Sequence, residues 1–227
     1  MAEQEEDEGR VFIDPEDGKE FTTRNLAKKH MIREGHRGAV IVTMPYYVSP
    51  EQIMADKAEF SRKGIARGKS IVALEYNSGI LLIAENATKL LKIGEIYDRV
   101  AFAGVGKFSE FDQLRKLGVR YADTKGYAYS RDDVVAKALA NAYSQTIGEA
   151  FTREMKPLEV EVIVAEVGDA GFENHEENVL YRIKFDGFIS DHRSFCVIGG
   201  DVDEVEQAIK QDHDTSMELI EAVRLGH

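Results

Sequence analysis

The sequence predicts an α+β fold in which antiparallel sheets and helices form separate layers. Two observations lead to this prediction. Extended patterns occur as neighbouring pairs joined by turn residues, and two helical patterns follow one another between residues 109 and 150. Separate runs of strands and helices favour a layered sandwich over alternating strand–helix–strand units. With 227 residues and 43% hydrophobic content, the chain is long enough to bury such a core.

The N-terminal part of the chain falls into two segments. Residues 1–8 include five acidic residues, and this composition predicts a disordered tail because it buries too little apolar surface to offset the entropy of ordering. Residues 9–43 are predicted to form an appended hairpin–helix segment. Its hairpin turns at an Asp-Pro and an Asp-Gly pair within residues 10–21, and its helix over residues 22–35 ends at Gly35.

A longer helix is predicted to begin at Ser49 and to end near Gly68. Ser49 is a favourable N-cap, Pro50 suits the first helical position, and Gln52 completes a capping box. Beyond Gly68 the pattern becomes extended, with apolar runs separated by short turns such as Asn-Ser-Gly. Two pairs of strands are therefore predicted, over residues 70–76 with 80–86 and over residues 92–98 with 100–106.

Two helices and a further run of strands complete the predicted layers. Ser109 would cap a short helix ending near Gly118, and Ser130 with Asp133 would cap a longer one. Three strands are expected within residues 158–200, with a turn at Asp186-Gly187, before an acidic helix from Asp201. The longer helix carries an apolar stripe that would pack on a sheet: Val135, Leu139, Ala142, Tyr143, Ile147 and Ala150.

Composition excludes several classes of function. A net charge of −12 opposes binding to nucleic acid or anionic membranes, although residues 61–69 form a local basic stretch. The chain has neither an apolar run of about 18 residues nor a basic secretory signal, so we expect a cytoplasmic protein without a membrane span. Cys196 is the only cysteine, and its apolar neighbours predict an inert thiol in the core.

The residues themselves predict no catalytic, cofactor or metal site. The segment "AGVGKF" fails as a phosphate-binding loop, because Ala101 replaces the first required glycine and Phe108 replaces the Ser or Thr that would bind magnesium. The six histidines show neither the i, i+4 spacing nor the CxxC-type spacing of metal sites. No nucleophile elbow is present. On this basis alone, Lys92 and Lys107 would be solvated surface lysines.

Longer stretches of the sequence resemble the alpha subunits of bacterial proteasomes of the actinobacterial type. The resemblance runs from about Met44 to at least Gly200 and includes "MPYYVSPEQIMADKAEFSRKGIARGKS", "LLKIGEIYDRVAFAGVGKFSEFDQLRKLGVRYADTKGYAYSRDDV" and "ALANAYSQTIGEAF" in this order. It implies an Ntn-hydrolase-like four-layer sandwich, with two β-sheets between helical layers, over residues 44–227. This domain would be C-terminally short, since the sequence stops before the last strands and helix of the family.

The resemblance also implies a noncatalytic function. Seven alpha subunits form an outer ring that gates entry to rings of beta subunits, and the beta subunits carry the threonine whose free amine activates its hydroxyl. The implied partners are other copies of the chain, beta subunits, a ring ATPase or other activator that docks its C-terminal tail, and unfolded protein substrates. The alternatives are a self-processing Ntn hydrolase and an interaction module whose acidic tail recruits basic partners.

Specific residues follow from the resemblance by position. The pocket for the activator tail would include Arg62, Gly68, Lys92 and Lys107, since an ammonium can pair with a terminal carboxylate and a glycine admits a close backbone. The gate would comprise Thr43, Met44, Pro45, Tyr46 and Tyr47. The segment over residues 9–43 is either an unrelated appended module or, through a circular permutation, the C-terminal part that the domain lacks. A third alternative is that the short C-terminus is a truncation.

Overall fold

The computed structural model describes residues 11–37, 40–43, 49–86, 89–168 and 177–226. The chain divides into two compact units, residues 1–52 and 53–227, and each is described by itself. The predicted acidic tail over residues 1–8 lies outside the described residues.

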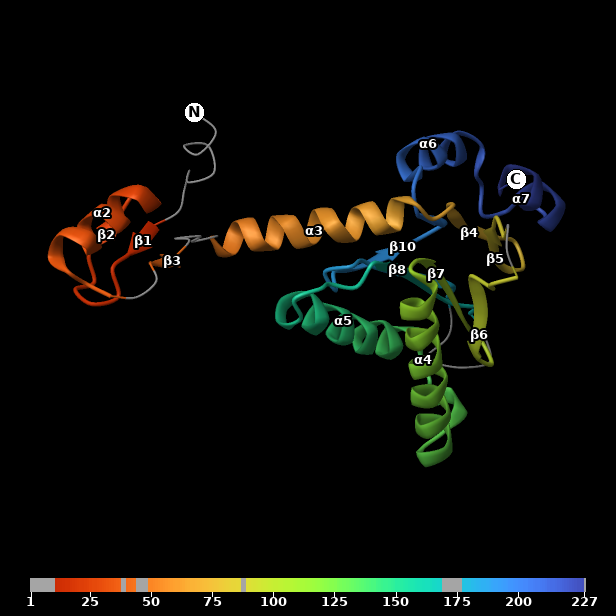
Figure 1. The fold of residues 1–227 in the computed structure, drawn as a ribbon. Coiled ribbons are helices and arrows are strands. Elements are labelled where there is room, and N and C mark those ends of the chain that lie inside the picture. The colour runs from red at the N-terminus through yellow and green to blue at the C-terminus, as the bar shows by residue number, and fades with distance from the viewer. Residues whose placement is uncertain (1–10, 38–39, 44–48, 87–88, 169–176, 227) are drawn as a thin grey trace. The chain divides into compact units, whose positions relative to one another are not determined.

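Over its described residues, 11–37 and 40–43, the N-terminal unit contains a small three-stranded sheet and a helix (Figure 1). β1 (Val11–Ile13) pairs with β2 (Glu20–Phe21) and with β3 (Ile41–Thr43), both antiparallel. The predicted hairpin is therefore confirmed, and so is the helix, α2 (Arg24–Glu34), which ends at Gly35 in the left-handed conformation. The ladder partners of β1 among the described residues are β2 and β3. The origin of this segment, as an appended module or as a permuted part of the fold, stays a prediction.

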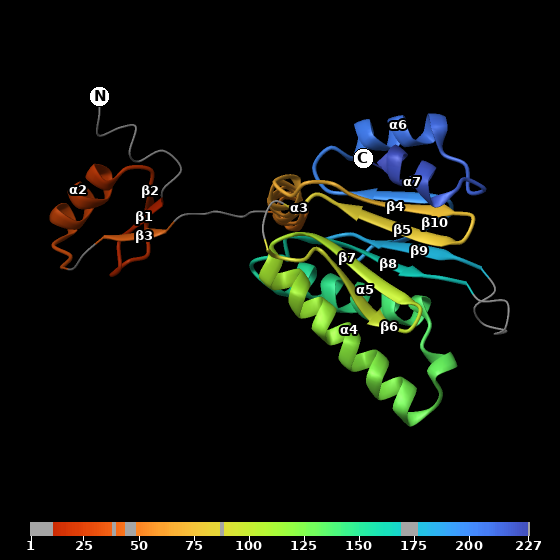
Figure 2. The same ribbon diagram turned by 90° about the vertical axis from the view of Figure 1, so that its right-hand side faces the viewer.

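The second unit consists of two sheets stacked between helices, as Figure 2 shows. The larger sheet has the strand order β10-β9-β8-β7-β6, and the smaller one has the order β11-β4-β5. The bounds of these strands are β4 (Ile71–Tyr76), β5 (Gly79–Ala84), β6 (Ile93–Tyr97), β7 (Val100–Gly106), β8 (Val160–Glu166), β9 (Val179–Ile183), β10 (Ile189–His192) and β11 (Phe195–Ile198).

Helices cover the outer face of each sheet (Figure 2). The larger sheet packs against α4 and α5, and the smaller one packs against α6 and α7. The N-terminus of α3 is capped by Ser49, whose Oγ accepts a hydrogen bond of 3.2 Å from the backbone N–H of Gln52. This confirms the predicted start of the helix. The bounds of these helices are α3 (Pro50–Ala66), α4 (Phe108–Ala128), α5 (Ala136–Arg153), α6 (Val202–Asp212) and α7 (Leu219–Gly226).

Three apolar clusters fill the spaces between the four layers. On β4, Ile71 and Ala73 face the larger sheet, whereas Val72 and Leu74 face the outer helices, as expected from the alternation of side chains along a strand. The third cluster, between the larger sheet and α4 with α5, contains Tyr143. The predicted layered α+β sandwich is thereby confirmed.

The prediction for α4 was wrong in length. Lys107, not Ser109, occupies the N-cap, and the helix continues through Gly118 to Ala128. A Cβ atom at position 118 would lie 1.8 Å from Tyr143 Oη, so this glycine permits close packing of α4 on α5 instead of ending the helix.

Two smaller corrections concern the regions that follow α4 and α5. Ser130 caps the short 3-10 helix η1 (Arg131–Asp133), and α5 begins only at Ala136. The region predicted to hold three strands contains four in its described parts, 158–168 and 177–200, because the predicted turn at Asp186-Gly187 divides the second of them into β9 and β10. Gly187 has a φ of 85°, which suits the turn.

The structure bears on two features considered in the composition, the thiol of Cys196 and membrane-spanning helices. Cys196 is fully buried in β11, and burial raises the pKa of its thiol to about 12, as an inert core thiol requires. Among the described residues, no helix combines the length and the apolar character needed to cross a membrane.

Candidate functional site

Gly68 lies where α3 gives way to β4, against the end of β7. Its N–H donates to the carbonyl of Ile65 at 2.8 Å, and its carbonyl accepts a hydrogen bond from the N–H of Gly200 at 3.2 Å. A Cβ atom at position 68 would lie 2.4 Å from Val105 Cγ2. Internal packing therefore already requires glycine here, apart from any role in admitting a ligand.

Lys92 directly precedes β6, and its side chain reaches the backbone beside Gly68. Its Nζ donates to the carbonyl of Lys69 at 3.2 Å, and its own carbonyl accepts from the N–H of Gly104 at 3.0 Å. Burial lowers the pKa of the Lys92 ammonium, which the negative charge of Glu85 partly offsets. Among the described residues, Lys92 forms no ion pair, so its ammonium keeps donors for an added acceptor.

Lys107 lies at the junction of β7 and α4, and its charge is already paired. Its N–H donates to the carbonyl of Glu159 at 2.9 Å, and its Nζ lies 3.2 Å from Glu110 Oε1. Glu110 also pairs with Lys156 Nζ at 2.9 Å and accepts from the N–H of Glu159 at 2.8 Å. Burial alone would raise the pKa of Glu110, but these hydrogen bonds lower it below its ordinary value.

The structure thus brings together three of the four predicted pocket residues. Gly68, Lys92 and Lys107 adjoin the last three residues of β7, whereas the guanidinium of Arg62 lies 5.4 Å from the ring centroid of Phe185. The segment "AGVGKF" is no phosphate cradle, because β7 continues its ladder with β8 as far as Gly106.

The predicted gate residues are described only in part. Thr43 is the last residue of β3, opposite Val11 in the ladder, and Met44, Pro45, Tyr46 and Tyr47 lie outside the described residues. A self-processing hydrolase would need a free amine at the start of its first core strand. Ile71, which begins β4, follows α3 in the chain, so this strand cannot present such an amine without loss of the helix.

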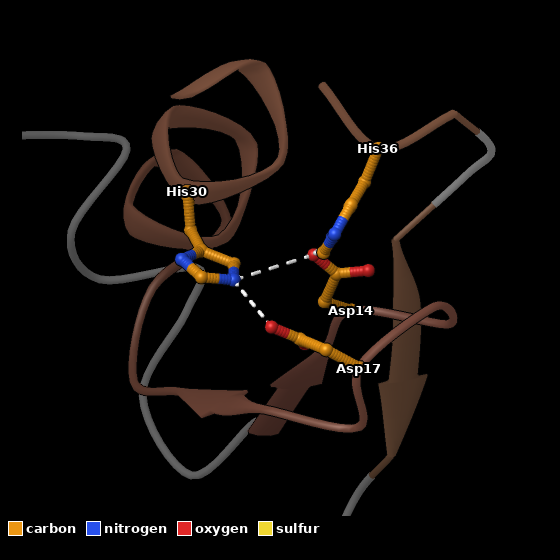
Figure 3. Close-up of side chains that lie close together, drawn as sticks. All are labelled: Asp14, Asp17, His30 and His36. Carbon is orange, nitrogen blue, oxygen red and sulfur yellow. Dashed lines mark hydrogen bonds and ion pairs between the residues drawn. The ribbon is translucent and has the colours of Figure 1, made fainter. Parts of the chain in front are cut away.

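Sequence reasoning missed a cluster of four side chains in the N-terminal unit (Figure 3). Asp14 and Asp17 come from the hairpin turn, His30 comes from α2, and His36 follows the helix. His30 Nε2 lies 2.7 Å from Asp17 Oδ2 and 3.6 Å from Asp14 Oδ2, and His36 Nδ1 lies 2.7 Å from Asp14 Oδ2. One ligand atom from each residue lies within 4.8 Å of the others.

The electrostatics of the cluster favour charged carboxylates. The pKa of Asp17 falls to about 2, first because the N–H of Lys19 donates to it and then because of His30. Asp14 is fully buried, yet hydrogen bonds from His36 and from the N–H of Glu16 lower its pKa. The bond with Asp14 raises the pKa of His36. The four residues therefore form an ordered network of acceptors and donors.

Comparisons with known proteins agree with the resemblance seen in the sequence. The model of the family described as "Proteasome subunit" matches residues 65–227. "Proteasome subunit alpha" of Pseudarthrobacter chlorophenolicus is 55% identical over 186 residues, which are 82% of this chain and 77% of that protein. The protein of the same name from Acidimicrobium ferrooxidans is 51% identical over 77% of this chain and 74% of its own length. That of Thermobifida fusca is 51% identical over 82% of this chain and 73% of its own length.

Proposed function

This chain belongs to the proteasome subunit family, as a noncatalytic alpha subunit, and from that premise we propose that it forms an outer ring with copies of itself, stacks on beta subunits and docks an activator tail at Lys92. The matching family model and the relatives support the alpha-type role. The docking role rests on the geometry around Gly68 and Lys92.

Ring formation has a candidate surface on α3. Ile53 and Phe60 are 42% and 44% exposed, and they lie seven residues apart, so they share one face of the helix. Large apolar side chains exposed together on one helix face are typical of a protein interface. The occupant that we propose is the neighbouring alpha subunit in the ring.

Docking of a C-terminal carboxylate is best served by Lys92. Lys107 is already paired with Glu110, and Arg62 lies over Phe185, whereas Lys92 has only a backbone carbonyl as its identified acceptor. A partly buried ammonium next to an exposed backbone turn suits a carboxylate, since a charge-assisted hydrogen bond is about twice as strong as a neutral one. The single observation that carries this assignment is the contact of Lys92 Nζ with the carbonyl of Lys69.

The remaining roles follow from the proposed assembly. We assign the gate to Thr43, which ends β3, and to Met44, Pro45, Tyr46 and Tyr47, which precede α3 in the sequence. Unfolded proteins would be the substrates of the whole complex, and the cytoplasm its location. The buried and unreactive Cys196 suits a reducing compartment.

Two measurements test this function. Electron microscopy of the purified chain, alone and with its beta partner, should show rings and stacked rings. A fluorescent activator-tail peptide should bind the assembled complex, and amidation of its C-terminus should weaken that binding. Failure to form rings with the beta partner would contradict the assembly, and equal binding of both peptides would contradict docking through a carboxylate.

A further inference from the structure

The hairpin turn of the N-terminal unit orients the carboxylates of Asp14 and Asp17 toward the two histidines. Asp14 Oδ1 accepts from the N–H of Glu16 at 3.0 Å, and Asp17 Oδ1 accepts from the N–H of Lys19 at 3.0 Å. The turn backbone therefore fixes both carboxylates through one oxygen each. In both residues it is the other oxygen, Oδ2, that faces the histidines (Figure 3).

The helix and the turn that ends it supply the two imidazoles. His30 is buried on α2, with 6% of its surface exposed. Gly35 adopts the left-handed conformation, with φ at 73°, and the N–H of His36 then donates to the carbonyl of Met31 at 2.9 Å. This helix end turns the chain back, so that the His36 ring lies 5.8 Å from that of His30, measured between centroids.

The spacing of the four residues matches that of a known class of structural metal site. Two residues separate Asp14 from Asp17, twelve separate Asp17 from His30, and five separate His30 from His36. The same intervals, on a hairpin followed by a helix, are those of Cys2His2 zinc sites, with carboxylates here in place of thiolates. Two carboxylates would balance the charge of a divalent cation, with both imidazoles neutral.

The distances between the ligand atoms are close to what a tetrahedral ion needs. Zinc bonds of about 2.0–2.2 Å to nitrogen and oxygen place the ligand atoms of a tetrahedron roughly 3.3–3.6 Å apart. The three identified separations are 2.7, 2.7 and 3.6 Å. The other separations are at most 4.8 Å. Entry of an ion would therefore replace two hydrogen bonds by metal bonds with shifts on the order of 1 Å.

The small core of the unit provides an independent reason for a metal. Among residues 11–37, the fully or nearly buried apolar side chains are Phe12, Ala27 and Met31. The unit spans residues 1–52, and below roughly 70–80 residues a single apolar core is usually supplemented by a disulfide, a metal or a partner. A disulfide is impossible here, because the only cysteine is Cys196 of the other unit.

We propose that Asp14, Asp17, His30 and His36 bind one divalent transition-metal ion, Zn²⁺ by preference, and that this ion holds the hairpin and the helix of the N-terminal unit together. Mixed imidazole and carboxylate ligands in a four-coordinate arrangement favour Zn²⁺ over Mg²⁺ or Ca²⁺, which take six or more oxygen ligands. The CxxC-type spacing and the i, i+4 histidine spacing do not include this arrangement, so neither pattern indicates it.

The test uses the full-length chain, stripped with a chelator, reloaded with Zn²⁺ and freed of excess metal. One zinc per chain should remain by mass spectrometry of the metal content, and Co²⁺ loaded in its place should give the strong visible absorption of tetrahedral coordination. Zinc retention at background level, or an octahedral cobalt spectrum, overturns the proposal.

Variants locate the ion. Asp17→Asn and His36→Gln change the two more exposed ligands, with 26% and 21% of their side chains exposed, and each should weaken zinc binding at least about 100-fold. Glu16→Gln, in the same turn, and His213→Gln, in the second unit, are the matched controls and should keep the zinc. Stoichiometric zinc in both ligand variants overturns the proposal.

A further measurement on the unchanged chain guards against variants that fail to fold. Limited proteolysis of the wild type with and without the chelator should show faster cleavage within residues 11–37 when zinc is removed. A chelator cannot weaken a cluster that is held by hydrogen bonds alone. Equal rates of cleavage therefore contradict the stabilising role.

Discussion

Lys92 and Lys69 are joined by a hydrogen bond from the ammonium of the first to the backbone carbonyl of the second, 3.2 Å long. We expect Lys92→Ala to weaken binding of an activator-tail peptide about tenfold or more, because a charge-assisted hydrogen bond to a carboxylate contributes about 1.5–3 kcal/mol. Fluorescence anisotropy with the assembled complex measures this. Lys92→Arg should restore part of the affinity, since it keeps the charge but changes the geometry.

The controls for this prediction separate a specific contact from a general effect of charge. Lys69→Ala removes a neighbouring lysine that is 66% exposed and paired with Glu85 at 3.5 Å, and it should change peptide affinity little. An activator-tail peptide with an amidated C-terminus should bind the wild type weakly, and Lys92→Ala should change that affinity very little. An equal loss on amidation in both proteins would show that Lys92 is not the partner of the carboxylate.

The exposed apolar face of α3 should be required for ring assembly. Replacement of Ile53 and Phe60 by aspartate places two charges in the proposed contact between subunits, where desolvation makes them costly. We expect monomers or small oligomers by analytical ultracentrifugation. Glu59→Gln, on the same helix, removes only a solvated pair with Lys63 and should leave rings intact. Intact rings in the double variant would mean that another surface assembles them.

Gly68→Ala should destabilise the fold by about 1–3 kcal/mol through overpacking, because its new Cβ atom would lie 2.4 Å from Val105 Cγ2. Val105→Ala in the same chain should recover part of that loss, which a double-mutant cycle of urea unfolding at one protein concentration would reveal. Gly148→Ala is the control, since its nearest neighbour is a carbonyl oxygen at 3.5 Å. Additive effects of the two substitutions at 68 and 105 would rule out this clash.

Glu110 should make the stability of the second unit depend on pH. Its pKa in the folded chain lies below the ordinary 4.5, so the unfolded chain binds the proton more tightly. The stabilisation is complete above about pH 4.5 and is lost as the pH falls through the folded pKa. At pH 7 we expect the free energy of unfolding of Glu110→Gln, measured with urea, to be about 1–2 kcal/mol lower than that of the wild type. In acid this gap in stability should close.

A matched substitution distinguishes this effect from a general loss of negative charge. Glu149→Gln removes an exposed carboxylate that lies 3.8 Å from Arg153 on one helix face, and it should change stability little at either pH. If the gap between the wild type and Glu110→Gln were the same at pH 7 and pH 3.5, the pairing of Glu110 with Lys107 and Lys156 would not be the source of the stabilisation.

The strand pairs are predictable from sequence because two local signals coincide there. The run from Ile71 to Leu74 is apolar on both faces, as a strand between two layers must be, and it is followed by the turn that joins β4 to β5. The end of α4 is not predictable in the same way. In the sequence, Gly118 indicates a helix end. In the structure, glycine is needed there because the Tyr143 side chain, 25 residues further along the chain, packs against this position.

The two candidate sites differ in how far the sequence reveals them. A single lysine such as Lys92 has no pattern of its own, and only the resemblance of the surrounding segment points to it. Asp14, Asp17, His30 and His36 do have a pattern, but their intervals become meaningful only when aspartate is admitted at positions where cysteine is usual. The close approach of their ligand atoms depends on the packing of α2 against the hairpin, which spacing alone does not establish.

The burial of Cys196 has a practical consequence for labelling. Its thiol is inaccessible and its pKa is raised to about 12, so almost none of it is thiolate at neutral pH. A maleimide dye or a nitroxide would therefore react at an introduced cysteine and leave the native one untouched. One cysteine introduced on α2 and another on α3 could then be labelled selectively. Spectroscopy of the two labels would measure the distance between the two units.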